Sequence, residues 1–178
     1  MSTLQLIFDL IDMRSFSNLW YWIALAVFWS STSHWVLGVP FDLVLRARRR
    51  GGAAADDLRD LLRINTTRLL LIWREAGLAL TLAGSFVLSA LATLGFAYAV
   101  EFCQAVLLLL APMTLVTAMS LRAARRISAL LAAADTSPEM LVATLTRHRL
   151  KVQLIGMLSI TITAFWGMLQ NFNLSVLG

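Results

Sequence analysis

The chain has 178 residues, of which 59% are hydrophobic and 14% are charged, and its mean hydropathy is +0.76. A water-soluble domain is nearer half apolar and about a quarter charged, so the composition excludes an ordinary soluble domain and indicates a protein of the lipid bilayer. The formal net charge of +5 does not indicate nucleic acid as a partner, because the basic residues flank apolar runs, as they do in membrane anchors.

Residues 1–16 predict a short amphipathic helix. Leu4, Ile7, Phe8 and Ile11 form an apolar stripe, and charged residues lie off it. Such a helix is too short to span a bilayer, so we expect it to lie flat on the outer surface. We expect no cleavable signal, because acidic residues stand where a signal peptide has its basic region.

Four later stretches reach the length of about 20 apolar residues that a spanning helix needs. They predict an all-α polytopic membrane protein in which residues 1–178 form a single domain of four transmembrane helices. The predicted spans cover about residues 19–39, 76–94, 96–121 and 152–172.

The segments between these spans, about residues 40–75 and 122–151, carry nearly all the basic residues. The first holds eight arginines, the second holds five arginines and Lys151, and only Arg14 lies elsewhere. The positive-inside rule therefore places both segments in the cytoplasm, and both termini and the turn near Gly95 in the periplasm. Both segments predict helical extensions of the spans, with a stop at Asp135 and a new helix beginning at Pro138.

His34 is the one histidine expected deep inside a span. A polar residue at that depth marks a functional-site hypothesis. The leading interpretation is a buried imidazole that is hydrogen-bonded to a neighbouring helix. Ligation of a metal or tetrapyrrole is a second interpretation, because Ser30 and Gly38 stand about one helical turn to either side, and proton transfer is a third.

Glu101 is the only formally charged residue within any predicted span, and it lies near the outer end of the third. A carboxylate in an ion pathway is normally joined by other charges at depth, and none is present here. We therefore expect Glu101 to make a structural or partner contact.

Two spans carry small residues at helical spacing, a pattern that lets helices approach closely. Pro112 in the third span leaves a carbonyl without its helical donor, so another group must donate to that carbonyl. The predicted packing residues are Gly77, Thr81, Ser85, Ser89 and Thr93 in the second span, and Gly156, Ser159, Thr163 and Gly167 in the fourth.

Two groups of arginines directly follow the first and third spans, where they would meet anionic lipid or a partner at the cytoplasmic surface. The residues expected in this contact are Arg46, Arg48, Arg49 and Arg50, together with Arg122, Arg125 and Arg126.

Enzyme motifs are not found. The sequence lacks the GxSxG, HExxH, Walker A and CxxCH patterns, so we expect no catalytic residue. Two histidines and the single Cys103 are too few for a zinc site within one chain, so we expect neither a bound metal nor another cofactor.

Three stretches carry a family resemblance: Asp12–Trp20, Ser33–Asp42 and Gly95–Phe102. They resemble a poorly characterised group of small alphaproteobacterial inner-membrane proteins that are often labelled as a component of the Suf iron–sulfur assembly complex. The resemblance extends over most of the chain and implies the bacterial inner membrane as location. It transfers no functional residue, because the shared stretches hold no known chemistry.

Three functions suit these features. The leading expectation is a non-enzymatic accessory or scaffold subunit of an inner-membrane assembly, surrounded by lipid and by other membrane subunits. A membrane dock for a soluble complex, such as iron–sulfur assembly machinery, is an alternative. A small transporter or channel, built as a homo-oligomer with His34 and Glu101 in its path, is another.

Overall fold

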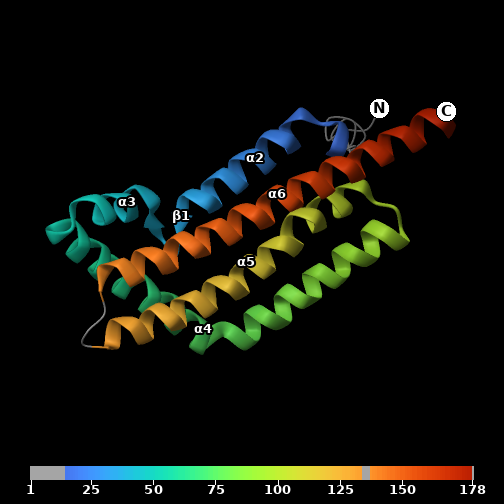
Figure 1. Cartoon of the computed structure of the whole chain (residues 1–178). Coiled ribbons are helices and arrows are strands. Elements are labelled where there is room, and N and C mark those ends of the chain that lie inside the picture. Colours follow the sequence, from blue (N-terminus) through green and yellow to red (C-terminus); the bar gives the residue numbers. More distant parts are fainter. Residues whose placement is uncertain (1–14, 134–136, 178) are drawn as a thin grey trace, which may run out of the picture.

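The computed structural model describes residues 15–133 and 137–177, and these are helical apart from one short hairpin and the short turns between helices (Figure 1). The predicted interfacial helix lies mostly outside the described residues, which begin with the last turn before the first long helix. In chain order the elements are the 3₁₀ turn η1 (Ser15–Ser17), α2 (Leu19–His34), β1 (Trp35–Val36), β2 (Val39–Pro40), α3 (Phe41–Arg50), α4 (Gly52–Ala92), the π-helical turn η2 (Thr93–Ala97), α5 (Glu101–Ala132) and α6 (Pro138–Leu177).

The all-helical fold is confirmed, and three helices are long and apolar enough to cross a membrane. These are α4 with η2, α5 and α6. Helix α2 has 16 residues, which corresponds to a length of about 24 Å against a hydrocarbon core of about 30 Å. Its length therefore does not by itself qualify it as a fourth span.

A hairpin ends α2 earlier than the sequence predicts. Val36 pairs with Val39, and the two residues between them have positive φ angles, 54° at Leu37 and 75° at Gly38. Positive φ at both central positions is the geometry of a type I′ turn, which reverses the chain within two residues. The stretch predicted as a continuous span over residues 19–39 is therefore helical only to His34, and its last residues lead into α3.

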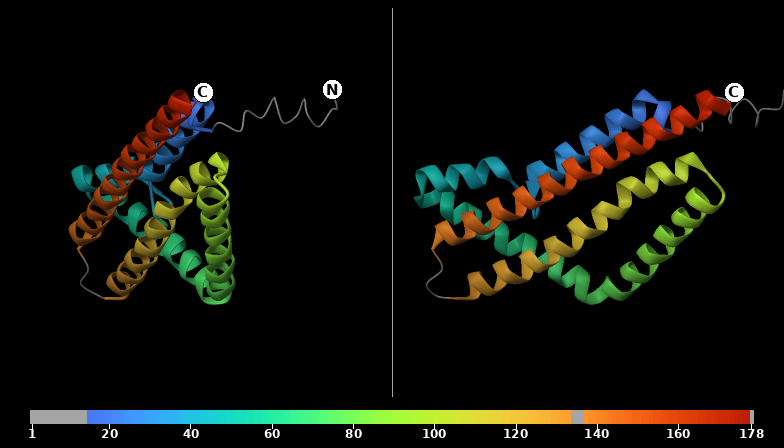
Figure 2. Two further views of the ribbon diagram at one scale, coloured as in Figure 1. Left: turned by 90° about the vertical axis from the view of Figure 1, so that its right-hand side faces the viewer. Right: turned by 45° about the vertical axis from the view of Figure 1, so that its right-hand side comes forward.

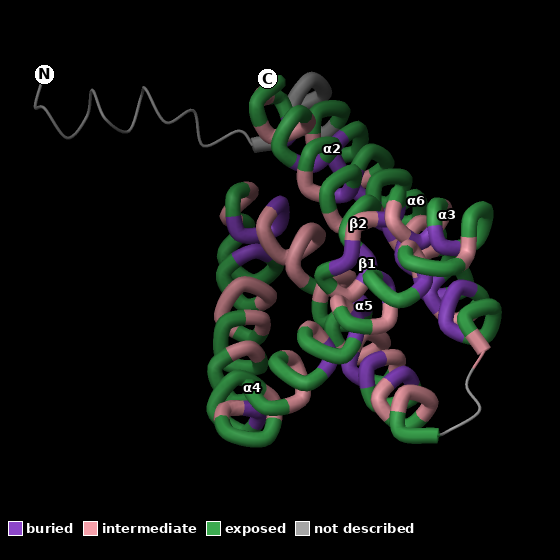
Figure 3. Tube along the Cα trace, turned by 90° about the vertical axis from the view of Figure 1, so that its left-hand side faces the viewer, coloured by how far each residue is buried: buried purple, intermediate pink, exposed green. Residues whose placement is uncertain are grey.

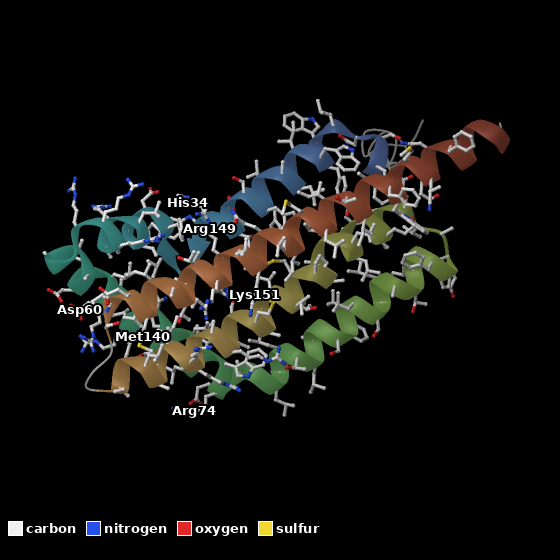
Figure 4. The ribbon with its side chains drawn as sticks, in the orientation of Figure 1. His34, Asp60, Arg74, Met140, Arg149 and Lys151 are labelled. Carbon is white, nitrogen blue, oxygen red and sulfur yellow. The ribbon has the colours of Figure 1, made fainter. Side chains whose placement is uncertain are left out.

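Helix α4 runs without interruption through the boundary between the predicted cytoplasmic segment and the second span, as expected. It bends near Arg74 although it contains no proline (Figures 2 and 4). At Gly77 a β-carbon would lie 3.2 Å from the ring of Trp73, so the missing side chain leaves room for that indole.

The connection between α4 and α5 differs from the predicted turn at Gly95. Residues 93–97 continue α4 as a π-helical turn, and the chain reverses at Ala99, which has a φ of 56°. As a result α5 begins at Glu101 rather than at residue 96.

Two apolar cores hold the helices together. Near α3, Val44 packs with Leu62 of α4, Ile127 of α5 and Leu145 of α6. The second core joins α2, α5 and α6, with Trp29 of α2 at its centre. We name the two ends of the molecule after their neighbours: the α3 end and the η1 end, at which both α2 begins and α6 finishes (Figure 1).

The second half of α4 diverges from these cores, and its surface is mostly exposed (Figures 2 and 3). Only 6% of the most apolar stretch of this helix is buried, compared with 22% for the corresponding stretch of α5 and 28% for that of α6. The chain by itself therefore covers little of this helix.

Candidate functional site

His34 is the last residue of α2, and its side chain is exposed. The expectation of a buried imidazole therefore does not hold within this chain. Helix α2 ends at His34, so Gly38 lies in the hairpin rather than one turn further along the same helix. His34 lines none of the four main cavities among the described residues.

Glu101 makes a structural contact near the other end of α2, at the η1 end of the molecule. Its Oε1 accepts a hydrogen bond of 2.7 Å from the backbone N–H of Phe16. Ser17 donates from Oγ to Oδ1 of Asn171 over 2.8 Å. These two bonds tie η1 to α5 and to α6, so the carboxylate has a partner in the fold.

A buried glutamine organises the η1 end, and the sequence analysis did not single it out. Gln104 donates from Nε2 to the carbonyl of Gly95 over 2.7 Å. Its Oε1 accepts from Nε1 of Trp166 and from Nε2 of Gln170, both at 2.9 Å. The side chain thus joins η2, α5 and α6. Its position directly after Glu101 and Cys103 in an apolar stretch was the available sequence signal.

The small residues predicted on the fourth span are all buried in α6. A β-carbon at Gly156 would lie 2.8 Å from the indole of Trp29. A β-carbon at Gly167 would lie 3.2 Å from Phe16, so both glycines let the chain of α2 and η1 approach α6 closely. Thr163 is fully buried between these two contacts.

Ser159, on the same face of α6, donates to the backbone carbonyl that Pro112 leaves without its helical donor. Its hydroxyl donates a long hydrogen bond of 3.4 Å to the carbonyl of Leu108. This carbonyl is four residues before the proline and has lost its usual donor. The buried hydroxyl of α6 therefore satisfies the freed carbonyl of α5, as the proline required.

The corresponding face of α4 has the opposite environment. Gly77 is buried against Trp73, but the remaining four small residues of this face are exposed: Thr81, Ser85, Ser89 and Thr93. The chain's other helices therefore leave most of this face uncovered.

A cavity of about 450 Å³ lies toward the α3 end. Its walls include Asn65, which donates from Nδ2 to the carbonyl of Gly38 over 3.0 Å and so holds the hairpin. Buried His148 also lines it, with Nε2 lying 3.2 Å from Oγ of Ser120. Burial and the positive charge of Lys151 lower the pKa of His148, which precedes the apolar segment of α6, so its imidazole is neutral at pH 7.

A neutral imidazole beside a serine hydroxyl resembles part of a hydrolytic triad, but a triad also needs a group that orients the second ring nitrogen. Within residues 15–133 and 137–177 no acidic side chain contacts His148. Nor do these residues include a cluster of three or more histidine, cysteine or acidic side chains that could hold a metal ion. The pair therefore supports hydrogen bonding between α5 and α6.

The predicted lipid-contact arginines fall into two groups. All four members of the first lie exposed on α3, where Arg46, Arg49 and Arg50 line a shallow cavity with Asp42. In the second group Arg122 and Arg126 line a different pocket, together with residues of α6, whereas the exposed Arg125 lines none of the described cavities.

The geometry thus offers helix-packing faces, a buried polar network at the η1 end and basic pockets at the α3 end. Comparisons with protein-family models, with curated proteins and with solved structures found no match for this chain.

Proposed function

We propose that the chain is a four-span protein of the bacterial inner membrane with both termini in the periplasm. Support for the fourth span comes from the packing of α2. Trp29 fits against Gly156, so α2 runs beside the apolar stretch of α6. Leu19, Trp20 and Val27 expose 59–75% of their surfaces, as lipid-facing residues do. A helix of 16 residues is accommodated by local thinning of the bilayer.

The proposed topology predicts the activities of inserted reporters. Alkaline phosphatase fused after Gly178 is expected to be active, because that enzyme folds in the periplasm. The same reporter inserted at Gly51, where a side chain would meet nothing within 4 Å, is expected to be inactive. A fluorescent protein that folds in the cytoplasm should give the opposite result at each site. An active phosphatase at Gly51 would contradict the charge argument.

The function we propose is that of a non-enzymatic accessory or scaffold subunit in a membrane protein assembly. The exposed small-residue face of α4 is the observation that carries this proposal. Hydroxyl-bearing residues in a bilayer usually face another helix, where their small side chains permit close approach and their hydroxyls find acceptors. Here Ser85 and Ser89 are exposed in the chain by itself. A transmembrane helix of another subunit would provide the missing neighbour.

Mild-detergent purification followed by mass spectrometry tests the accessory function. The wild-type chain is expected to retain a stoichiometric membrane partner, and Ser85→Leu/Ser89→Leu should release it by blocking close helix approach. The matched control is Ala79→Leu/Ala83→Leu, which adds similar bulk to exposed positions on a different face of α4. Equal retention by both variants, or recovery of the chain only as copies of itself, would contradict the proposal.

A second candidate, a membrane dock for a soluble complex such as iron–sulfur assembly machinery, is supported by the four exposed arginines of α3 and by the resemblance described above. This role predicts a soluble acidic complex in the same purification instead of a membrane subunit. The transporter alternative gains no comparable support, since His34 and Glu101 lie near opposite ends of α2 and line none of the cavities described above.

A further inference from the structure

A basic pocket of about 330 Å³ lies between α5 and α6 toward the α3 end. Arg122 and Arg126 enter it from α5, and Arg147 and Lys151 enter it from α6. The pocket has no acidic lining residue. The two side-chain ion pairs found within the described residues both involve other arginines, so none of these four cations forms an ion pair there. Arg147 also lines a neighbouring cavity that includes Glu139, without an ion pair between them.

Four unpaired positive charges around one small space repel one another, and a bound anion relieves that repulsion. Phosphate suits this geometry, because a guanidinium donates two parallel hydrogen bonds to its oxygens and an ammonium adds a compact charge. The hydroxyl-bearing Thr144 also lines the pocket. The side chains thus match a phosphate group better than a neutral ligand.

Its position along both helices places the pocket at the level of lipid headgroups. The apolar segment of α5 ends at Leu121, one residue before Arg122. The apolar segment of α6 begins at Val152, one residue after Lys151. Although the two helices run in opposite directions, both change from basic to apolar at the same depth.

Apolar side chains continue each basic face toward the middle of the membrane. On α5, Leu115 and Met119 stand at helical spacing from Arg122, and Leu115 is half exposed. On α6, Leu154 and Leu158 stand in the same relation to Lys151, and they expose 53% and 61% of their surfaces. A ligand with a phosphate and an acyl chain would contact both parts.

We propose that this pocket binds the phosphate-bearing headgroup of one anionic glycerophospholipid, whose acyl chains lie along the adjoining apolar faces of α5 and α6. The inference uses the proposed placement of these helices in the membrane, and it is independent of the accessory role. It also distinguishes between neighbouring basic residues. Arg149 points to the other side of α6, where its guanidinium carbon is 3.8 Å from the ring centroid of Phe41, whereas Lys151 faces α5 (Figure 4).

Native mass spectrometry in a neutral detergent tests the proposal with three probes: short-chain phosphatidylglycerol, short-chain phosphatidylcholine and inorganic phosphate. The wild-type protein is expected to bind one phosphatidylglycerol at least about tenfold more tightly than phosphatidylcholine. Inorganic phosphate should bind more weakly than phosphatidylglycerol, because it lacks the apolar contact. Binding of inorganic phosphate as tight as that of phosphatidylglycerol would assign the pocket to free phosphate and overturn the lipid assignment.

The site variant is Arg126→Gln/Arg147→Gln, which removes one cation from each helix. Its affinity for phosphatidylglycerol should fall about 30-fold, on the order of fivefold for each cation removed. The matched control Arg50→Gln/Arg125→Gln removes the same charge from exposed positions outside the pocket and should lose less than about threefold. Equal losses in both variants would show only a diffuse attraction and overturn the proposal.

A charge-conserving variant guards against loss of binding through misfolding. Arg126→Lys/Arg147→Lys should bind phosphatidylglycerol more tightly than the glutamine variant, because the headgroup still meets four cations although the two bidentate guanidinium contacts are lost. A loss as large as that of the glutamine variant would contradict an attraction between these charges and a phosphate.

Discussion

Gly156→Ala is expected to destabilise the protein by about 1–3 kcal/mol, the range for overpacking a well-packed contact. The added β-carbon would lie 2.8 Å from the ring of Trp29, a rigid side chain that is itself buried in the second core. The indole has no flexible end to move aside, so α2 must shift away from α6. Unfolding of the purified protein by sodium dodecyl sulfate in mixed micelles, followed by circular dichroism, measures the change.

The matched control for this prediction is Gly84→Ala. Gly84 also lies inside a long helix, but a β-carbon there would meet nothing within 4 Å. Alanine is the better helix former, so the control should be neutral or slightly stabilising. The double variant Gly156→Ala/Trp29→Leu should lose less stability than the sum of the losses in the two single variants. Equal stabilities of the Gly156 and Gly84 variants would contradict the close contact between α2 and α6.

Gln104→Leu is expected to cost roughly 2 kcal/mol, because it removes three hydrogen bonds from one buried and two partly buried partners. The partners are the carbonyl of Gly95, the indole N–H of Trp166 and the side-chain amide of Gln170. Leucine fills a similar volume, so the loss reports on polarity more than on a cavity. The same detergent titration measures it.

Two smaller substitutions separate the network from a general packing effect. Trp166→Phe and Gln170→Leu each remove one of the two hydrogen bonds that the side-chain oxygen of Gln104 accepts, so each should cost less stability than Gln104→Leu. In a double variant with Gln104→Leu, the cost of Gln170→Leu should largely vanish, since the bond is already lost. Full additivity of the two costs would show that the network does not couple α5 to α6.

The spacing of small residues in the sequence does not predict which of the two small-residue faces is buried. Spans two and four carry glycine, serine and threonine at similar helical spacing, which predicts the same packing role for both. In the structure the set on α6 is buried between α2, η1 and α5, whereas on α4 only Gly77 is buried. Spacing defines a face of a helix, but the rotation and divergence of the whole helix decide what that face meets.

The candidate site shows the same division. The sequence marked Arg122 and Arg126 as lipid contacts, because they follow an apolar run directly. It did not join them to Arg147 and Lys151, which stand more than 20 residues further along the chain and enter the pocket from α6. Gln104 was overlooked for a similar reason, since its partners Trp166 and Gln170 come from the far end of the chain.

The sequence by itself determined the helical class, the continuity of α4 through the second apolar segment and the new helix at Pro138. These properties are local, because a helix in a bilayer satisfies its own backbone hydrogen bonds and can be recognised from its length and hydropathy. By contrast, the end of α2, the small-residue face that is covered and the basic residues that share a pocket all depend on tertiary packing. Each of these depends on how closely and at what rotation two distant segments approach, and close packing makes that outcome a property of all the contacting side chains together.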